Sequence, residues 1–116
     1  MAEASEKEQL GILEIQIQGA TQVCLDISSR FLFESALFAR REESELSPNE
    51  LCDMMRSAQR ETYADGVDEK TYHPYMWLWK PHYYYPGLHF YNFPYAFGHL
   101  FALGLYAIFR KEGKKK

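Results

Sequence analysis

Seven histidine and tyrosine side chains crowd into residues 82–95, two of them imidazoles and five of them phenols, and all can donate hydrogen bonds. They are His82, Tyr83, Tyr84, Tyr85, His89, Tyr91 and Tyr95. Tyrosine hydroxyls and imidazole N–H groups are good donors to an oxyanion or a peptide carbonyl, and Gly87 lets the chain approach a backbone closely. The alternative is that the rings pack as structure and turn their hydroxyls to water. On the residues alone, both interpretations stand.

A metal site or a nucleophilic triad needs residue spacings that this chain lacks. It contains no HExxH and no CxxC, and no two histidines stand at i and i+4, the spacing of two zinc ligands on one helix. His73, His82 and His89 are 9 and 7 residues apart on loop-like sequence, which only weakly supports a site. No nucleophile elbow accompanies the serines. We therefore expect no metal ligands and no complete active site in this chain.

The first element that positions these residues is a long helix, predicted over about 8–42. Small or apolar residues recur at steps of three and four, as on one stripe of a helix; they are Leu10, Leu13, Ile17, Ala20, Cys24, Ile27, Phe31 and Phe38. The alternating segment LEIQIQ at 13–18 favours a strand, but it is much shorter than the helical pattern. Glu34 interrupts the stripe. Because burying a lone carboxylate is costly, we expect Glu34 to make a structural hydrogen bond or a salt bridge to another helix.

A second helix is predicted over about 47–64, antiparallel to the first. Ser47 is the expected N-cap, with Pro48 as the first helical residue and Glu50 completing a capping box. Gly66 is expected to end this helix in the left-handed conformation.

A loop rich in proline and aromatic residues is predicted over 72–92. Four prolines fall within 21 residues, from Pro74 to Pro94, and leave room for at most a short helix from Pro74 to Trp79. Pro86 and Gly87 mark a turn.

A third helix is predicted over 93–112, with Asn92 as its N-cap and Gly113 at its end. The segment Phe93–Phe109 carries no formal charge. A helix that is apolar on all sides either spans a membrane or lies in the core of a larger body. A span needs about 20 residues and this segment is shorter and contains His99, so we favour burial.

Length and composition fit one all-α domain over residues 1–116. Aromatic residues make up 16% of the chain, and 16 of the 19 lie between Tyr63 and Phe109. A chain of this size buries only about 65% of its unfolded surface. We therefore expect the aromatic half to meet a partner surface or a ligand.

Charge and cysteine content exclude several classes of protein. Residues 1–70 carry a net charge of −8 and residues 71–116 a net charge of +5, which sum to −3. The only basic run is Lys114–Lys116, so nucleic-acid binding is not expected. Cys24 and Cys52 are too few for a disulfide scaffold and are expected to be buried, reduced thiols. The polar N-terminal segment lacks a secretory signal, so a cytoplasmic location is expected.

The run from Met76 to Gly113 resembles the C-terminal region of oligoendopeptidase F, a family of zinc metallopeptidases related to thimet oligopeptidase. Its Pro-His, FYNFPYAFG, Leu-Gly-Leu-Tyr and Glu-Gly segments follow the order of that family. Upstream, SSRFLFE, SALFARR, ELSPNEL and AQRETY resemble the helical pair that precedes this loop. The resemblance covers roughly Leu13 to Gly113. It implies zinc-dependent hydrolysis of short peptides.

The resemblance also implies roles for residues of the aromatic loop. In the family, a histidine and tyrosines of this loop hydrogen-bond the substrate carbonyl as it becomes tetrahedral. His82 and Tyr95 match the positions that stabilise this transition state. Tyr91, Tyr84 and Tyr85 match positions that bind the substrate.

The chain departs from the family by lacking its HExxH, both zinc-binding histidines, the catalytic glutamate and the downstream glutamate ligand. We therefore expect a C-terminal fragment of the catalytic domain, with no zinc bound and no activity in this chain alone. Glu34 matches a family position that is not a metal ligand. Two alternatives remain: a non-catalytic helical module that forms homo-oligomers through its aromatic surface, and a membrane-associated protein anchored by 93–109.

Overall fold

The computed structural model describes residues 4–113, and within that stretch it contains helices and turns but no strand. The prediction of an all-α fold is therefore confirmed. The helices are α1 (Glu6–Thr21), α2 (Ile27–Arg41), α3 (Pro48–Tyr63) and α4 (Phe93–Glu112); a π-helical turn covers Gln22–Asp26, and 3₁₀ turns cover Glu69–Thr71, Met76–Trp79 and Pro81–Tyr83. The basic run at 114–116 lies outside the described residues.

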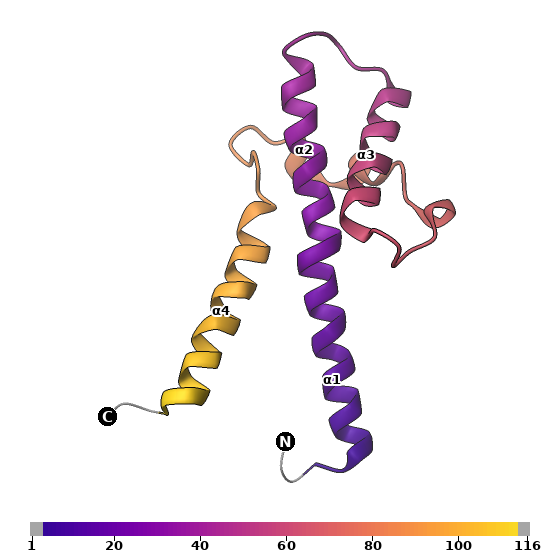
Figure 1. Ribbon diagram of the computed structural model, residues 1–116. Helices are drawn as coiled ribbons and strands as arrows, with labels where there is room; N and C mark the ends of the chain where they lie inside the picture. The colour runs from indigo at the N-terminus through magenta and orange to yellow at the C-terminus, as the bar shows by residue number, and fades with distance from the viewer. Residues whose placement is uncertain (1–3, 114–116) are drawn as a thin grey trace.

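The helix α1, the π-helical turn and α2 continue into one another as a single rod (Figure 1). The rod confirms the helix predicted over about 8–42 and the helical interpretation of 13–18. A capping box starts it, in which the Glu8 N–H donates to the Ser5 hydroxyl and the Ser5 N–H donates to the Glu8 carboxylate.

The π-helical turn interrupts the apolar stripe that the sequence predicts along this rod. A π turn holds more residues than an α turn, so it shifts the side chains of α1 around the axis relative to those of α2. Ile27 is the buried apolar member of the stripe in α2, whereas α1 has no buried residue. The α2 residue in the core cluster is Phe33, which lies off the predicted stripe. The stripe therefore predicts the helix correctly but not the face that packs in the core.

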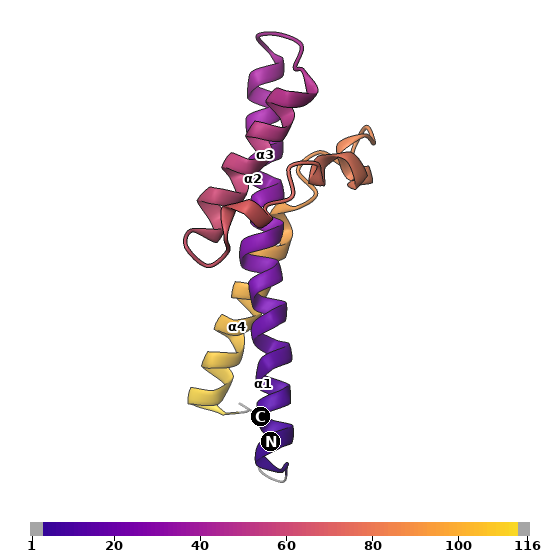
Figure 2. The ribbon, with the colours of Figure 1, turned by 90° about the vertical axis from the view of Figure 1, so that its right-hand side faces the viewer.

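The helix α3 lies antiparallel beside α2 (Figures 1 and 2). The Glu50 N–H donates to Ser47 Oγ at 3.3 Å and the Ser47 N–H donates to the Glu50 carboxylate at 2.9 Å, which confirms the capping box. The helix ends at Tyr63, close to the predicted end, but the predicted left-handed residue is wrong, because Ala64 rather than Gly66 takes a positive φ, of 49°. Gly66 instead lets the chain pass close to the end of α3. Its N–H donates to the Tyr63 carbonyl at 2.9 Å, and a Cβ would stand 3.2 Å from that oxygen.

A small core lies between α2, α3 and the loop that follows α3. Its buried members are Phe33, Met55, Ala58 and Met76. Gln59 of α3 is 1% exposed and fastens the loop to this core. Its Nε2 donates to the His73 carbonyl and its Oε1 accepts from the His73 N–H, both at 2.9 Å. The long loop therefore starts from a fixed point.

The loop between α3 and α4 is more tightly turned than the sequence predicts. The short helix expected from Pro74 to Trp79 is a single 3₁₀ turn at Met76–Trp79. Lys80 then takes an extended conformation, with ψ 100°, because Pro81 disfavours helical geometry in the residue before it. The turn predicted at Pro86-Gly87 is confirmed, with φ 88° at the glycine.

The helix α4 has the bounds that the sequence predicts, with Asn92 in the N-cap position and Gly113 closing it at φ 73°. The sequence predicts that this helix is buried in a larger body, and that burial stays a prediction, because within this chain the helix is uncovered. None of its residues is buried, and Phe97 and Phe101 are 67% and 58% exposed. The main contacts of α4 are with α2 and the π-helical turn, and it diverges from α1 (Figure 1).

The molecule is elongated. Its radius of gyration is 18.3 Å and its extents are 57 × 35 × 22 Å, whereas a compact chain of this length has a radius of gyration of about 13 Å. The first turn of α1 and the last turn of α4 lie at the same end of the molecule (Figures 1 and 2).

Two further expectations from the sequence can be compared with the structure. In the part of the chain that is described, no helix has the length and apolar content needed to cross a bilayer. Cys24 and Cys52 are both free thiols, as expected, but Cys24 is half-buried and only Cys52 is buried.

Candidate functional site

Three of the five predicted site residues come together where the loop enters α4. The ring centroids of His82 and Tyr91 lie 5.8 Å apart, and those of Tyr91 and Tyr95 lie 5.7 Å apart. Tyr91 and Tyr95 are 48% and 39% exposed, so a ligand can reach them from solvent. We call His82, Tyr91 and Tyr95 the donor cluster.

Asn92 ties the donor cluster to the start of α4, in a role that the sequence does not reveal. It occupies the N-cap position as predicted, but its side chain makes no capping hydrogen bond. Instead its Nδ2 lies 2.8 Å from His82 Nε2, and the residue is only 4% exposed. The local Asn-Phe-Pro signal indicates a cap, and no spacing rule pairs residues ten positions apart in a loop.

His82 and Tyr95 of the donor cluster are uncharged at neutral pH. Burial, and then the positive charges of Arg30 and Lys80, lower the pKa of His82 below its ordinary value. Because Nε2 accepts a hydrogen bond, the proton of the neutral imidazole is on Nδ1. Hydrogen bonding with Tyr91 raises the pKa of Tyr95 above its ordinary value, so this hydroxyl keeps its proton. The cluster therefore offers neutral N–H and O–H donors.

Tyr83 connects the donor cluster to the core. Its ring centroid lies 4.4 Å from that of His82 and 5.4 Å from that of Phe33. Its hydroxyl donates to the Arg30 carbonyl at 3.2 Å, and burial raises its pKa well above the ordinary value. Tyr83 is therefore a positioning residue that holds His82 against the helical hairpin.

The remaining donors of residues 82–95 lie apart from the cluster. The Tyr84 hydroxyl donates to the Trp77 carbonyl at 2.9 Å, and Tyr85 is 57% exposed beside the proline-glycine turn. The His89 ring packs edge-on against Phe38, with centroids 5.2 Å apart. Tyr84 and Tyr85 do not join the donor cluster, so their substrate-binding role stays a prediction.

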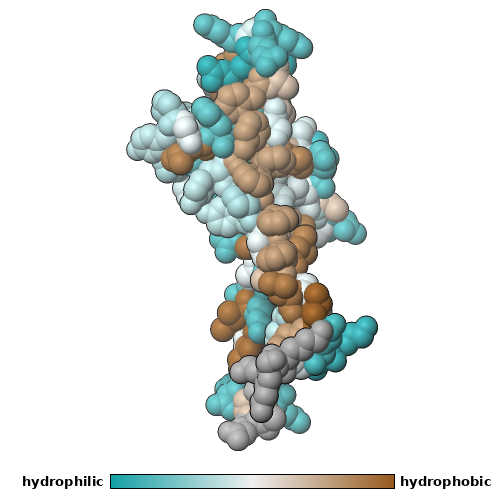
Figure 3. All heavy atoms as spheres, turned by 90° about the vertical axis from the view of Figure 1, so that its left-hand side faces the viewer, coloured by the Kyte–Doolittle hydropathy of each residue, from teal (hydrophilic) through white to brown (hydrophobic). Residues whose placement is uncertain are grey.

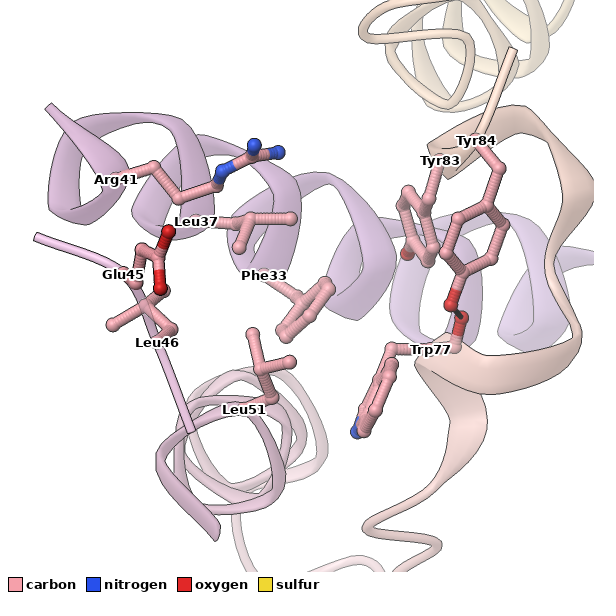
Figure 4. Close-up of a pocket in the computed structure, with 9 residues that line it drawn as sticks. All are labelled: Phe33, Leu37, Arg41, Glu45, Leu46, Leu51, Trp77, Tyr83 and Tyr84. Carbon is pink, nitrogen blue, oxygen red and sulfur yellow. Dashed lines mark hydrogen bonds between the residues drawn. The ribbon is translucent and has the colours of Figure 1, made fainter. Parts of the chain in front are cut away.

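A cavity of about 370 Å³ adjoins the donor cluster through Tyr83. Residues from α2, α3 and both connecting loops line it (Figure 4): Phe33, Leu37, Arg41, Glu45, Leu46, Leu51, Trp77, Tyr83 and Tyr84. Arg41 and Glu45 stand at one side, and the aromatic side chains of the loop stand at the other (Figure 4). Ligand pockets in proteins begin at about 300 Å³. The size and lining of this cavity suit one apolar side chain.

Glu34 fixes the loop immediately before the donor cluster. It is 1% exposed, and its Oε1 accepts from the Phe90 N–H at 2.8 Å. The expected structural hydrogen bond is confirmed, although the partner is loop backbone rather than another helix. Phe90 has φ 56°, which is rare for a bulky residue, and its ring packs against Phe31 and Phe38 at 5.9 and 5.3 Å. The bond thus sets the direction in which the chain reaches Tyr91.

Replacing Glu34 with glutamine is expected to change how stability depends on pH. Burial raises the pKa of Glu34 above 4.5, although the Phe90 N–H and the charge of His89 act in the opposite direction. Between pH 4.5 and the raised pKa, the folded chain keeps a proton that the unfolded chain has lost. This group therefore makes the wild-type protein less stable as the pH rises through that window. Relative to Glu34→Gln, the wild-type free energy of unfolding should fall from acid to neutral pH in urea titrations.

The matched control is Glu45→Gln, which removes one carboxylate from the exposed segment between α2 and α3. Its free energy of unfolding should follow that of the wild type across the pH series. A difference between wild type and Glu34→Gln that stays constant from acid to neutral pH contradicts the prediction.

A zinc ion does not fit the residues of this site. Among residues 4–113, no three histidine, cysteine or carboxylate side chains gather as a metal site requires. His82 Nε2 is occupied by Asn92, and Glu34 Oε1 is occupied by Phe90. Comparison of the chain with protein-family models, curated proteins and solved structures found no match, so the donor cluster and its cavity are the basis on which we assign a function.

Proposed function

We propose that this chain forms one wall of the peptide-binding cleft of a zinc-dependent oligopeptidase. In this proposal, the donor cluster binds the carbonyl of a short peptide while it becomes tetrahedral. The observation that carries it is the gathering of His82, Tyr91 and Tyr95 on an accessible surface at the start of α4. The resemblance of Met76–Gly113 to oligoendopeptidase F supports the same assignment.

Neutral donors suit this task because their hydrogen bonds strengthen as charge develops on the acceptor. A hydroxyl or imidazole N–H binds an oxyanion about twice as strongly as a neutral carbonyl oxygen. The cluster would therefore stabilise the tetrahedral state more than the ground state, which is the condition for accelerating the reaction. Tyr95 and His82 Nδ1 are the donors assigned to the oxyanion, and Tyr91 orients Tyr95 and contacts the substrate.

The cavity beside the cluster is the proposed place for an apolar side chain of the peptide. Tyr83 forms a wall of the cavity and contacts His82, so a side chain bound there would lie next to the donors. Phe33, Leu37 and Leu51 supply its apolar surface. We therefore expect a preference for peptides with an aliphatic or aromatic residue near the bound carbonyl.

In the proposed enzyme, a bound zinc ion supplies the activated water. Its ligands would come from polypeptide other than residues 4–113, because these residues hold no cluster of zinc ligands. The contribution of this chain is to bind and orient the peptide and to donate hydrogen bonds. A cytoplasmic location is part of the proposal, because two free thiols fit a reducing compartment.

A peptide in which one amide is replaced by a phosphinate tests the proposal, because the phosphinate is a tetrahedral anion. The 116-residue chain should bind this analogue more tightly than the parent peptide in calorimetric titrations. Tyr95→Phe removes one donor to a charged acceptor and should weaken binding of the analogue by about 10-fold or more. Its effect on the parent peptide should be smaller.

The matched control is Tyr75→Phe, which removes a hydroxyl from another tyrosine that is 52% exposed. It should leave the affinities for both peptides unchanged. Equal affinity of the wild type for the two peptides would contradict the proposed role of the donor cluster. So would an equal loss of affinity for the analogue in Tyr95→Phe and Tyr75→Phe. Chelator-sensitive hydrolysis by the pure chain with added zinc would contradict the division of labour between this chain and the zinc-binding part.

A further inference from the structure

The helices α1 and α4 expose far more apolar surface than a helix in solution normally does. Five large apolar residues of α1 and nine of α4, not counting Tyr95 of the donor cluster, are between 37% and 70% exposed. A band of apolar side chains runs along the side of the molecule where α4 lies, with hydrophilic side chains beside it (Figure 3). The two helices diverge around a groove of about 780 Å³, which Leu13 and Ile17 line from α1 and Leu103 and Tyr106 line from α4. Contiguous apolar surface of this extent marks an interaction site.

The exposed area matches what a stable dimer requires. These fourteen large side chains, each showing roughly half of its surface, present on the order of 1,000 Å² of apolar area per chain. A standard protein interface buries about 800 Å² on each partner. One partner that covers the groove and its rims is therefore sufficient.

The charges at the ends of the two helices favour a second copy of this chain as the partner. The first turn of α1 carries Glu6 and Glu8 on either side of Lys7, and the last turn of α4 carries Arg110 and Lys111 beside Glu112, so the two ends have net charges of opposite sign. These opposite charges lie at the same end of the molecule (Figure 1). A two-fold axis parallel to the rod would place the acidic end of each α1 beside the basic end of the partner's α4. Each α1 would run antiparallel to the partner's α4, so the positive end of one helix dipole would lie beside the negative end of the other.

We propose that two copies of this chain associate through α1 and α4 into an antiparallel four-helix bundle around a two-fold axis. Each α4 then lies between its own α1 and the partner's α1, which explains why it is apolar on all sides rather than on one stripe. The donor cluster lies at the opposite end of α4 and stays open in the dimer. The proposal is thus independent of the peptide site.

Light scattering coupled to size-exclusion chromatography tests the dimer. The wild type should elute at twice 13.7 kDa, and Leu103→Glu should elute at 13.7 kDa. The matched control is Leu78→Glu in the 3₁₀ turn, because Leu103 and Leu78 are 50% and 54% exposed and undergo the same change. Leu78→Glu should remain a dimer. Circular dichroism should show the same helix content in all three proteins.

Ile17→Glu on α1, at a residue that is 65% exposed, provides a second variant that should also be monomeric. A monomeric wild type overturns the proposal and indicates that another polypeptide covers α1 and α4. Larger species that grow with concentration overturn it as well, because a closed bundle stops at two copies. A dimer that survives both substitutions in the groove places the interface elsewhere. None of these outcomes alters the phosphinate-binding test, so the two proposals fail separately.

Discussion

Phe33→Ala is expected to lower the free energy of unfolding by about 3–5 kcal/mol, the usual cost of deleting a buried aromatic ring. Phe33 is 1% exposed and belongs to the core with Met55, Ala58 and Met76. It also supports the ring of Tyr83 at 5.4 Å, and Tyr83 supports His82. The substitution should therefore weaken binding of the phosphinic peptide at denaturant concentrations where the chain is still folded. Urea unfolding and calorimetry, both at one protein concentration, measure the two effects.

Tyr85→Ala is the control, since it deletes a ring that is 57% exposed in the same loop. Its free energy of unfolding should stay within about 0.5 kcal/mol of the wild type. A loss at Phe33 no larger than the loss at Tyr85 would show that the small core does not hold the hairpin together.

Gln59→Met should lower the free energy of unfolding by about 1–3 kcal/mol, although the two side chains are similar in size. The substitution leaves the His73 N–H without the partner that Gln59 provides at 2.9 Å, and it removes one of the two donors to the His73 carbonyl, which still accepts from the Met76 N–H at 3.2 Å. The loop should also come loose at its start. Amide hydrogen exchange should therefore accelerate from His73 to Trp79 before it accelerates in α2.

Gln18→Met makes the same chemical change on the exposed surface of α1, where the side chain only reaches Glu14 at 3.4 Å. It should change stability by less than about 0.5 kcal/mol. If Gln59→Met is equally mild, or if exchange accelerates uniformly over the whole chain, the anchoring role of Gln59 is wrong.

Features that neighbouring residues decide could be predicted from the sequence. The capping box of Ser47 and Glu50, the turn at Pro86-Gly87 and the closure of α4 at Gly113 all depend on hydrogen bonds or backbone preferences within a few positions. The long helix was predictable because its pattern of apolar residues is several times longer than the rival alternation at 13–18.

Features that depend on contacts between distant residues could not be predicted. Asn92 shows a capping signal, but a histidine ten residues upstream competes successfully for its amide. The left-handed residue after α3 is Ala64. Gly66 occupies a position where a Cβ would press against the Tyr63 carbonyl oxygen. The exposure of α4 likewise depends on what packs against it, and composition alone says only that something should.

The donor cluster lies between these two cases. The resemblance indicates His82, Tyr91 and Tyr95 together, and the structure brings these three residues to one surface. Tyr84 is also matched to a family position that binds substrate, yet its hydroxyl donates to the Trp77 carbonyl. The side-chain direction of a residue in a loop depends on nearby acceptors, which a sequence motif does not encode.

The π-helical turn at Gln22–Asp26 gives chain length an unusual importance. A π turn takes up about one residue more than an α turn, so deleting one residue there would allow an unbroken α-helix that keeps α1 on nearly the same side of the rod. Leu13 and Ile17 would then still line the groove beside α4. Deleting two residues would rotate α1 by about 100° relative to α2. The two deletions would thus separate assembly from folding: the hairpin would persist in both, while the surface that two copies are proposed to share would be kept only in the first.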